Sequence, residues 1–415
     1  MTFDHLKDRP VTVDFPNIRH LRAFCEVARH RGISAAADAV FLSQPAITQA
    51  ISKLETLLGV ALFDRLTDGM SLTKPGVMFK FRVDRMLEQL ELGFAEASRL
   101  QPGKSTRADR QVTAAQLRAL IALAEARNFT IAARDIGISQ PSIHRAGRSL
   151  EKLVGFQLFR TASQGIELTD AAERLARRAR LAASEMRQAF FEIAAYRGRD
   201  STEIVVGSMP LARTRILPQA MHQILQHQSG IQLRTIEGPY SELLRSLRYG
   251  ESDFLIGALR DPVPAGDVVQ ERLFDDLLAI VVRRGHPLCM RADISLADTV
   301  DYPWIAPPKA TPAGSYLYQT LRISDMAATP VKVVSSSLVL VRGLLLEGDY
   351  VTIISRHQVR HDLESGSLVT LPITLPDSAR AIGLTTRKGW QPTPTQAKFI
   401  DSVKAAAVHL NPDPL

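Results

Sequence analysis

SQPAITQAISKLETLLGVALF, residues 43–63, returns after 96 positions as SQPSIHRAGRSLEKLVGFQLF, residues 139–159. The likeness extends to both sides, and 21 of the 53 aligned pairs between residues 21–73 and 117–169 are identical without a gap. Self-similarity at a fixed period indicates a duplicated structural unit. The chain of 415 residues therefore contains two copies of one small domain, and about 200 residues beyond them suffice for one or two more.

Each copy has the pattern of three helices followed by a two-stranded hairpin. In the first copy, Ser43 can cap a third helix whose first turn contains Pro45, at a position that requires no N–H group. Ile47, Ile51 and Leu54 recur at helical spacing and predict the buried face of that helix. The sequence thus predicts a helix-turn-helix in which this third helix presents its other face to solvent.

The remaining parts of the two copies agree with this pattern. The second helix is expected to begin at Ser34 and at Thr130, because both can act as N-caps. The polar, glycine-containing segment 64–69 lies between apolar residues and predicts a two-stranded wing. Copy two differs chiefly at Gly147, which stands where copy one has Ile51 and which weakens a helix by about 1 kcal/mol relative to alanine.

The outward face of each third helix carries the chemistry that reads nucleic-acid bases. Glutamine, threonine, serine, histidine and arginine can bond to base edges, whereas a protein that binds only the DNA backbone would show mostly lysine and arginine. Arg145 and Arg148 predict the stronger contact for copy two, because arginine can form paired hydrogen bonds with guanine or phosphate. The residues expected to contact double-stranded DNA are Ser43, Gln44, Pro45, Thr48, Gln49 and Lys53 in copy one and Ser139, Gln140, Pro141, His144, Arg145 and Arg148 in copy two.

The positive charge is confined to the first half of the chain. The net charge is +8, and residues 1–199 hold 30 Lys or Arg against 21 Asp or Glu, while residues 200–415 hold 21 against 22. This asymmetry favours a polyanion-binding half joined to a neutral half, and by itself it leaves DNA, RNA and membrane surfaces open.

The composition excludes several classes of protein. Apolar residues make up 45% and charged residues 23% of the chain, as in globular rather than disordered proteins. Two cysteines, Cys25 and Cys289, provide no disulfide framework and no multi-cysteine zinc site. The first residues contain no apolar signal core, and no run of about 18 apolar residues occurs, so we expect a cytoplasmic protein without a membrane span.

Short apolar strands alternate with helical segments from residue 203 onward, which predicts an α/β fold with largely parallel sheets. Two subdomains, about 200–278 with 386–410 and about 279–385, are expected to be joined by crossing strands as a periplasmic-binding-protein-like (type 2) clamp. Ligands of such sheets bind beyond the carboxyl ends of the strands, beside helix N-termini. The alternative is that the hydroxyl side chains there only cap helices. The candidate ligand-binding residues are Ser208, Met209, Pro239, Thr311, Ser336 and Ser337.

A long helix is predicted after each copy, at residues 74–100 and 170–196, with a polar linker at residues 101–110. Each helix requires a partner, either within the chain, where a short linker gives a high effective concentration, or in a second chain. Their expected apolar faces are Val77, Phe81, Leu87, Leu90 and Phe94, and Leu175, Leu181, Met186, Phe190 and Ile193. The expected order is a winged helix-turn-helix at 17–75, a linker helix and linker at 76–110, a second winged helix-turn-helix at 113–171, a linker helix at 172–199 and a ligand-binding domain at 200–415.

The repeated S-Q-P, L-E and L-F motifs resemble the winged helix-turn-helix of LysR-type transcriptional regulators. The resemblance covers nearly the whole chain, since Ile204–Ser208, the Gly285–Leu288 turn and Ser335–Ser337 resemble the family's effector-binding half. It implies a regulator whose operator binding or activation is controlled by a small-molecule effector, with no cofactor and no metal. It further implies a homo-oligomer, with RNA polymerase as a candidate partner. The duplication of the DNA-binding domain departs from the family's usual layout.

Within the family, the effector half resembles the branch of galactose-binding-protein regulators. The residues that carry this likeness are Gly238-Pro239-Tyr240, the run Leu255–Asp261 and Gln358-Val359-Arg360. The likeness implies a sugar, a sugar acid or another small carboxylate as effector, and relatives in the family also respond to aromatic acids.

Two other classes of function compete with a regulator. An enzyme is not favoured, because the chain lacks a G-x-S-x-G elbow, a P-loop and a G-x-G-x-x-G motif. His357 and His361 have the spacing of a zinc pair, but Gln358 stands where a metalloprotease requires its glutamate base. The second alternative is an architectural or interaction protein that binds DNA and retains a vestigial ligand domain.

Overall fold

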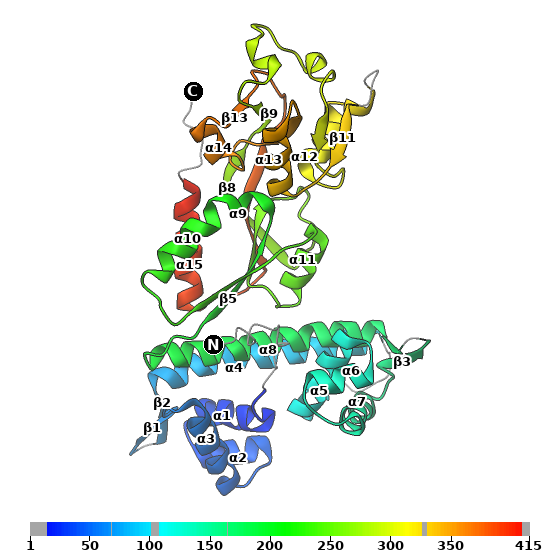
Figure 1. Cartoon of the computed structure of the whole chain (residues 1–415). Helices are drawn as coiled ribbons and strands as arrows, with labels where there is room; N and C mark the ends of the chain where they lie inside the picture. Colours follow the sequence, from blue (N-terminus) through cyan, green and yellow to red (C-terminus); the bar gives the residue numbers. More distant parts are fainter. Residues whose placement is uncertain (1–14, 68, 101–107, 164, 326–329, 409–415) are drawn as a thin grey trace, which may run out of the picture. The chain divides into compact units, whose positions relative to one another are not determined.

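The computed structural model describes residues 15–67, 69–100, 108–163, 165–325 and 330–408, which divide into two compact units near residue 202 (Figure 1). The first unit contains both copies of the repeat and the long helices that follow them. The second contains two five-stranded sheets with their helices. The predicted α/β multidomain architecture with two winged helix-turn-helix domains is therefore present.

In copy one, α3 (Gln44–Leu58) follows α1 (Ile18–His30) and α2 (Ile33–Val40), and β1 (Phe63–Leu66) pairs with β2 (Gly69–Leu72) as the wing. Ser43 caps α3 as predicted, since its hydroxyl accepts a hydrogen bond from the Ala46 amide at 3.4 Å. The expected N-cap of the second helix at Ser34 is wrong by two residues, because Gly32 holds the cap position in extended conformation.

In copy two, α5 (Ala114–Ala126), α6 (Phe129–Asp135) and α7 (Gln140–Val154) precede the wing strands β3 (Phe159–Ala162) and β4 (Gly165–Leu168). The expected cap at Thr130 is wrong, because the Asn128 side chain accepts from the Thr130 and Ile131 amides and starts α6 earlier. The Phe159 ring fills the space beside Gly147, since a Cβ added to Gly147 would lie 3.3 Å from that ring.

Both wings are fixed to their third helices by the same contacts. Glu55 accepts a hydrogen bond from the Leu62 amide at 2.7 Å, and Glu151 accepts from the Leu158 and Phe159 amides at 2.8 and 3.0 Å. These carboxylates are the glutamates of the repeated L-E motif. The geometry explains why that dipeptide occurs in both copies, since it sets the wing relative to the helix.

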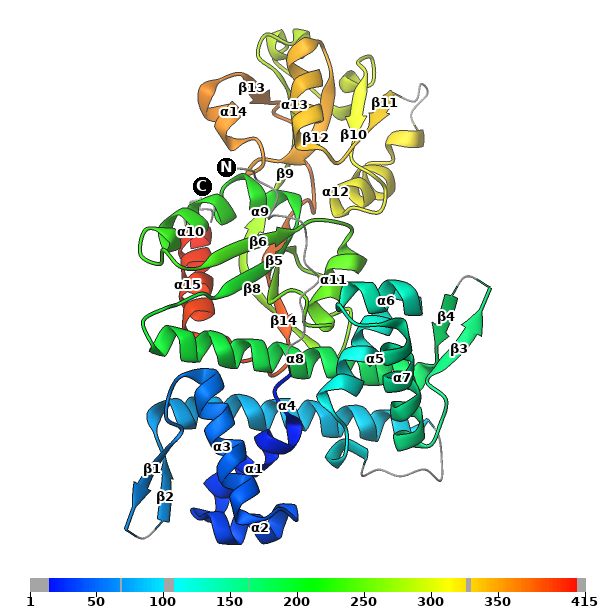
Figure 2. The same ribbon diagram turned by 60° about the horizontal axis from the view of Figure 1, so that its bottom comes forward.

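The two long helices, α4 (Lys74–Arg99) and α8 (Asp170–Tyr196), pack side by side within the first unit (Figures 1 and 2). They run antiparallel, because Arg82 near the start of α4 bonds to Glu192 near the end of α8. This is the intrachain arrangement, the first of the two alternatives for their pairing. Most of the predicted linker lies outside the described residues, of which Ala108–Arg110 form a short 3-10 turn.

The predicted buried face of α4 is wrong at its first turns. Val77 and Phe81 are 55% and 47% exposed, and the buried side chains are instead Phe79, Val83 and Met86. Leu90 and Phe94 are buried as expected. In α8, Leu175, Met186 and Ile193 are buried, and Leu181 and Phe190 are half-buried.

The second unit is built on two mixed sheets, so the expectation of largely parallel sheets is wrong. In the first sheet β14 runs antiparallel to both its neighbours, and in the second β9 does. The first sheet has the order β6 (Gln232–Ile236), β5 (Glu203–Ser208), β7 (Phe254–Ala258), β14 (Arg380–Arg387), β8 (Val268–Asp276). The second has the order β11 (Val331–Val334), β10 (Trp304–Ala306), β12 (Val351–Ser355), β9 (Leu278–Arg283), β13 (Leu368–Thr370).

The subdomain boundary expected at residue 385 is also corrected. Because all of β14 lies in the first sheet, the chain returns to the first subdomain before Arg380. The longer helices of this unit cover its sheets, with α10 packed against α15. The helices are α9 (Pro210–Thr214), α10 (Ile216–Leu225), α11 (Tyr240–Arg248), α12 (Pro312–Ser315), α13 (Leu338–Glu347), α14 (Arg360–Ser365) and α15 (Pro394–Val408).

Candidate DNA interface and ligand cleft

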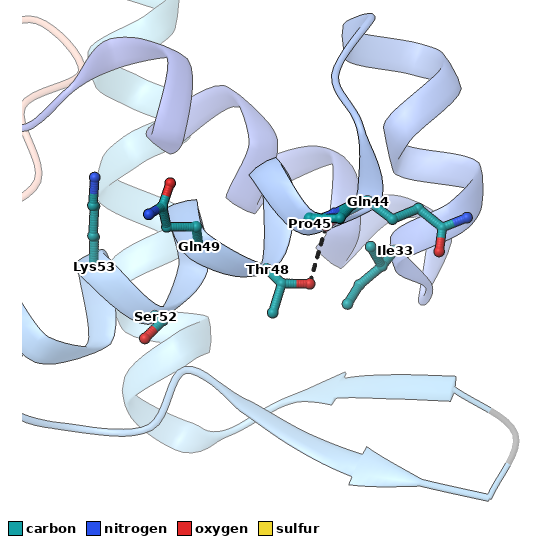
Figure 3. A pocket seen from close by; sticks show the side chains of 7 residues that line it. All are labelled: Ile33, Gln44, Pro45, Thr48, Gln49, Ser52 and Lys53. Carbon is teal, nitrogen blue, oxygen red and sulfur yellow. Dashed lines mark hydrogen bonds between the residues drawn. The ribbon is translucent and has the colours of Figure 1, made fainter.

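The outward face of α3 forms a polar surface beside the wing (Figure 3). Gln44, Pro45, Thr48, Gln49, Ser52 and Lys53 line a depression of about 610 Å³ together with Ile33 of α2. Thr48 donates its hydroxyl to the Gln44 carbonyl at 3.0 Å, which holds that side chain against the helix. The other polar side chains extend away from the helix, where they can reach an external partner (Figure 3).

The corresponding face of α7 is more basic, and its arginine side chains bond to other side chains of the same helix. The Arg145 guanidinium donates to the Ser142 hydroxyl at 3.3 Å, and Arg148 forms an ion pair with Glu151 at 2.8 Å. The His144 ring lies 5.1 Å from the ring of Phe129. Copy two therefore presents two guanidinium groups and an imidazole where copy one presents neutral side chains.

All twelve residues predicted to contact DNA are exposed on the surface of the two helix-turn-helix domains. Ser43 also caps its helix, whereas the Ser139 hydroxyl bonds to that of Ser142 at 2.8 Å. The structure brings these residues together as two separate faces, one on each third helix. A surface of this kind can offer donors and acceptors to base edges in a major groove.

The charges near the two faces differ. Burial lowers the pKa of His20, and the positive charge of the nearby Lys53 lowers it further, so that His20 is neutral at pH 7. At the start of the wing, copy one has Asp64 where copy two has Arg160. A carboxylate there repels phosphates and an arginine attracts them, which adds to the more basic character of copy two.

A cleft of about 780 Å³ lies within the second unit. The four loops after β5, β6, β10 and β11, which hold most of the predicted ligand-binding residues, all reach it. Met209, Pro239, Thr311 and Ser336, four of the six predicted residues, line the cleft. The structure thus brings most of the candidate residues to one place.

Ser208 and Ser337 do not line the cleft. Ser208 is the last residue of β5 and is buried, with a hydroxyl that has no hydrogen-bond partner in the described structure. Ser337 is the cap of α13, since its hydroxyl accepts from the Leu340 amide at 3.4 Å. Thr311 combines both roles, because it lines the cleft and also caps α12 through the Gly314 amide at 3.1 Å.

Polar side chains beyond the six predicted residues also line the cleft, among them Arg213, Tyr240 and Arg380. Arg213 pairs with Glu237, and Arg380 pairs with the buried Asp276. The Arg380 Nε and the Tyr240 hydroxyl are buried without a hydrogen-bond partner in the described structure. Burial also raises the pKa of Tyr240 and lowers that of Arg213. Arg380 can be assigned to the cleft only once β14 is known to lie in the first sheet, and Arg213 has the pattern of a solvated helix residue.

Glu237, Ser241, Ser335, Thr352 and Gln358 also line the cleft, and the greater part of the remaining wall is apolar. It is formed by proline, leucine, isoleucine and valine side chains from both subdomains, chiefly Leu211, Pro307, Pro308, Leu338, Ile353 and Ile382. Across the described ranges of the chain, no group of three or more potential metal-ligating side chains is present. Nor does any helix that the structure describes have the length and apolarity to cross a membrane.

Comparison with known proteins agrees with this architecture. Residues 18–77 and 114–173 each match the model of the bacterial regulatory helix-turn-helix protein, lysR family, and residues 197–408 match the LysR substrate binding domain. The regulator GalR of Pseudomonas putida is 32% identical over 399 residues, which cover 95% of this chain and 98% of GalR. That match is long enough to include both copies of the repeat.

Two further matches are shorter. The regulator PcaQ of Agrobacterium fabrum is 28% identical over 303 residues, 73% of this chain and 97% of PcaQ. The solved structure of full-length OxyR from Pseudomonas aeruginosa superposes with a TM-score of 0.52 at 21% identity, covering 72% of this chain and 96% of that one. This likeness supports the fold.

Proposed function

Because the chain belongs to the LysR family of DNA-binding, effector-responsive transcriptional regulators, we propose how its two parts divide that work. The faces of α3 and α7 bind operator DNA, and the cleft of the second unit binds a small carboxylate with an apolar body. Occupation of the cleft then changes operator binding or transcription activation. The family is one of regulators and not of enzymes.

The observation that supports the DNA contacts is the exposure of all twelve predicted residues on two third helices. Each face is flanked by a wing that a hydrogen bond to a glutamate of the third helix holds in place. Lys53, Arg145 and Arg148 supply charge for phosphates or guanine, and the glutamines supply paired bonds for adenine. This mixture of side chains suits base reading better than binding to the DNA backbone alone.

Footprinting of the full chain on its own promoter region tests the DNA contacts. We expect protection of a defined site at fixed salt, lost in Gln44→Ala combined with Gln140→Ala. Lys388→Ala, a basic residue of the second unit, is a matched control that leaves the footprint intact. Protection that covers the DNA uniformly would favour the architectural alternative instead.

The chemistry of the cleft supports the class of effector. Arg213 and Arg380 are cations in a largely apolar space, and the unpartnered Arg380 Nε and Tyr240 hydroxyl are donors that an oxygen-rich group would satisfy. Burial makes each unsatisfied donor unfavourable by roughly 1–3 kcal/mol, which a carboxylate can recover. The apolar wall suits a hydrocarbon or aromatic body better than a polyhydroxylated sugar. Sugar acids remain the other class that the family resemblance implies.

A thermal-shift screen of the full chain against aliphatic, aromatic and sugar acids tests this proposal. Binding raises the melting temperature in proportion to the free energy RT ln(1 + [L]/Kd). We expect the largest shift from an aromatic or aliphatic carboxylate, reduced in Ser336→Ala. Ser337→Ala is the matched control, because that hydroxyl caps α13 outside the cleft. A shift from neutral sugars alone would contradict the assignment of a carboxylate.

A further inference from the structure

The pair of helices α4 and α8 has a pseudo-twofold pattern that follows from the 96-residue repeat. Arg82 of α4 and Arg178 of α8 occupy the same repeat position. Arg82 bonds to Glu185 and Glu192 at 2.9 and 2.6 Å, and Arg178 bonds to Gln89 and Glu96 at 2.9 and 3.0 Å. The partners also match by the repeat, since Glu185 corresponds to Gln89 and Glu192 to Glu96. The middle turns of the two helices, around residues 87 and 183, therefore lie opposite each other.

The apolar side chains at the centre of this pair are not equivalent. Copy one has Val83, Met86 and Leu87, whereas the corresponding residues of copy two are Ala179, Ala182 and Ala183. Val83, Met86, Ala179 and Ala182 are buried in one core, and Leu87 and Ala183 are partly buried against it. Large side chains of α4 thus pack where α8 carries small ones, and Gly93 of α4 lets the Arg178 side chain of α8 approach closely.

This complementarity distinguishes the observed pair from the two alternatives. Two copies of α4 would bring Met86 against Met86 near the same crossing, which overfills the core. Two copies of α8 would bring alanine against alanine and leave voids. The ion pairs do not discriminate, since each helix carries both an arginine and its acceptors. Side-chain volume therefore favours α4 with α8 over either helix with itself.

The two recognition faces that this pair carries are also different. Gln44 and Gln140 match by the repeat, but Thr48, Gln49, Ser52 and Lys53 correspond to His144, Arg145, Arg148 and Ser149. Glutamine pairs with adenine and arginine with guanine in the major groove. A DNA-binding unit that contains one α3 and one α7 therefore recognises two different base sequences.

We propose that one chain by itself forms an asymmetric DNA-binding unit, in which the pair of α4 and α8 holds one α3 and one α7. This unit recognises a non-palindromic DNA site made of two unlike half-sites. The inference rests on the proposed DNA-binding function and adds to it the pairing and the symmetry of the operator. The half-sites share the bases read by the first turn of the third helix. They differ where copy one offers Gln49 and copy two offers Arg145.

Cross-linking of the full chain tests the intrachain pairing. Glu96→Cys with Arg178→Cys, in a Cys289→Ser background, places two thiols where an ion pair joins α4 and α8. A short bismaleimide is added to an equal mixture of unlabelled and ¹⁵N-labelled chains, and the linked peptides are weighed. Only light–light and heavy–heavy peptides are expected. Mixed peptides at about half of the total would show pairing between chains and overturn the proposal.

Selection of bound sequences from a random DNA library tests the symmetry of the site. The wild type should prefer two unlike half-sites over a palindrome of either half by about tenfold or more. His144→Thr, Arg145→Gln, Arg148→Ser and Ser149→Lys together give α7 the outward face of α3. Selection with this variant should yield a palindrome. A palindrome selected by the wild type would overturn this inference and leave the proposed function intact, whereas selection of no sequence would overturn both.

Discussion

Replacing Arg82 by methionine should destabilise the first unit strongly, because it removes the centre of a buried ion cluster. The Arg82 side chain is 1% exposed, and those of Glu185 and Glu192 are 8% and 10% exposed. Burial alone would lower the pKa of Arg82, but its bonds with Glu192 and Glu185 outweigh that effect and raise it. The guanidinium is therefore charged at any pH in which the protein is handled. Its loss leaves two buried carboxylates with incomplete compensation.

The size of the effect follows from that burial. Removing one partner of a buried pair typically destabilises a protein by about 3–5 kcal/mol. Arg178→Met is the matched control, because it removes the equivalent arginine where the side chains of Arg178 and Glu96 are 20% and 19% exposed. Solvent compensates more of that loss, so about 1 kcal/mol is expected.

Amide hydrogen exchange in α4 and α8 of the full chain measures both losses locally, which avoids assuming a single unfolding transition. Adding Glu192→Leu to Arg82→Met should restore part of the protection, because it removes a carboxylate that has lost its guanidinium, whereas Glu185 keeps its ion pair with Arg85 at 2.8 Å. The reasoning is refuted if Arg82→Met loosens the helices no more than Arg178→Met does.

Three further perturbations have definite expected outcomes. Arg145→Ala should weaken operator binding by about 1–3 kcal/mol at fixed salt and Gln49→Ala by less, and a reversed order in a fluorescence anisotropy titration would reassign the stronger contact to copy one. Phe41 is 94% exposed and has a φ of 55°, in the left-handed region, where copy two has Gly137. Phe41→Gly should therefore stabilise copy one by about 0.5–1 kcal/mol in denaturant unfolding, and an appreciable loss of stability from Phe41→Ala would show that the ring is packed. Burial lowers the pKa of His286, so the unfolded chain takes up its proton first and the free energy of unfolding should fall as pH drops below about 6.5. His286→Asn can still accept the Leu288 amide bond and should reduce that slope, and an unchanged slope would assign it to other groups.

The repeat made the DNA-binding half largely predictable from sequence. Every motif there is seen twice, and the apolar spacing of a short helix leaves little choice of face. The long helices were harder, because α4 is apolar over more than one stripe. Phe81 lies on the exposed side, where the guanidinium groups of Arg82 and Arg85 lie 5.5 and 5.7 Å from the ring centre. A cation can thus support an exposed aromatic ring, which hydrophobic periodicity alone assigns to the core.

The ligand cleft was only partly predictable. The predicted succession of strands and helices indicated the four loops, since ligands of such sheets bind beyond the carboxyl ends of the strands. It did not identify which side chain of each loop points inward. Ser336 lines the cleft while the adjacent Ser337 caps a helix. The exact residue at which α13 begins therefore decides which of the two serines faces the cleft. Arg380 could not be placed until β14 was known to lie in the first sheet.

The covalent order of α4 and α8 has a consequence for synthesis on the ribosome. Roughly 100 residues separate the end of α4 from the end of α8, so at about 5–20 residues per second the first helix waits some 5–20 s for its partner. During that interval Phe79, Val83 and Met86 have no α8 to cover them, and nascent chains on one messenger lie close together. Mutual exclusion of two α4 helices, through the bulk at their crossing, would keep neighbouring nascent chains apart until each has made its own α8.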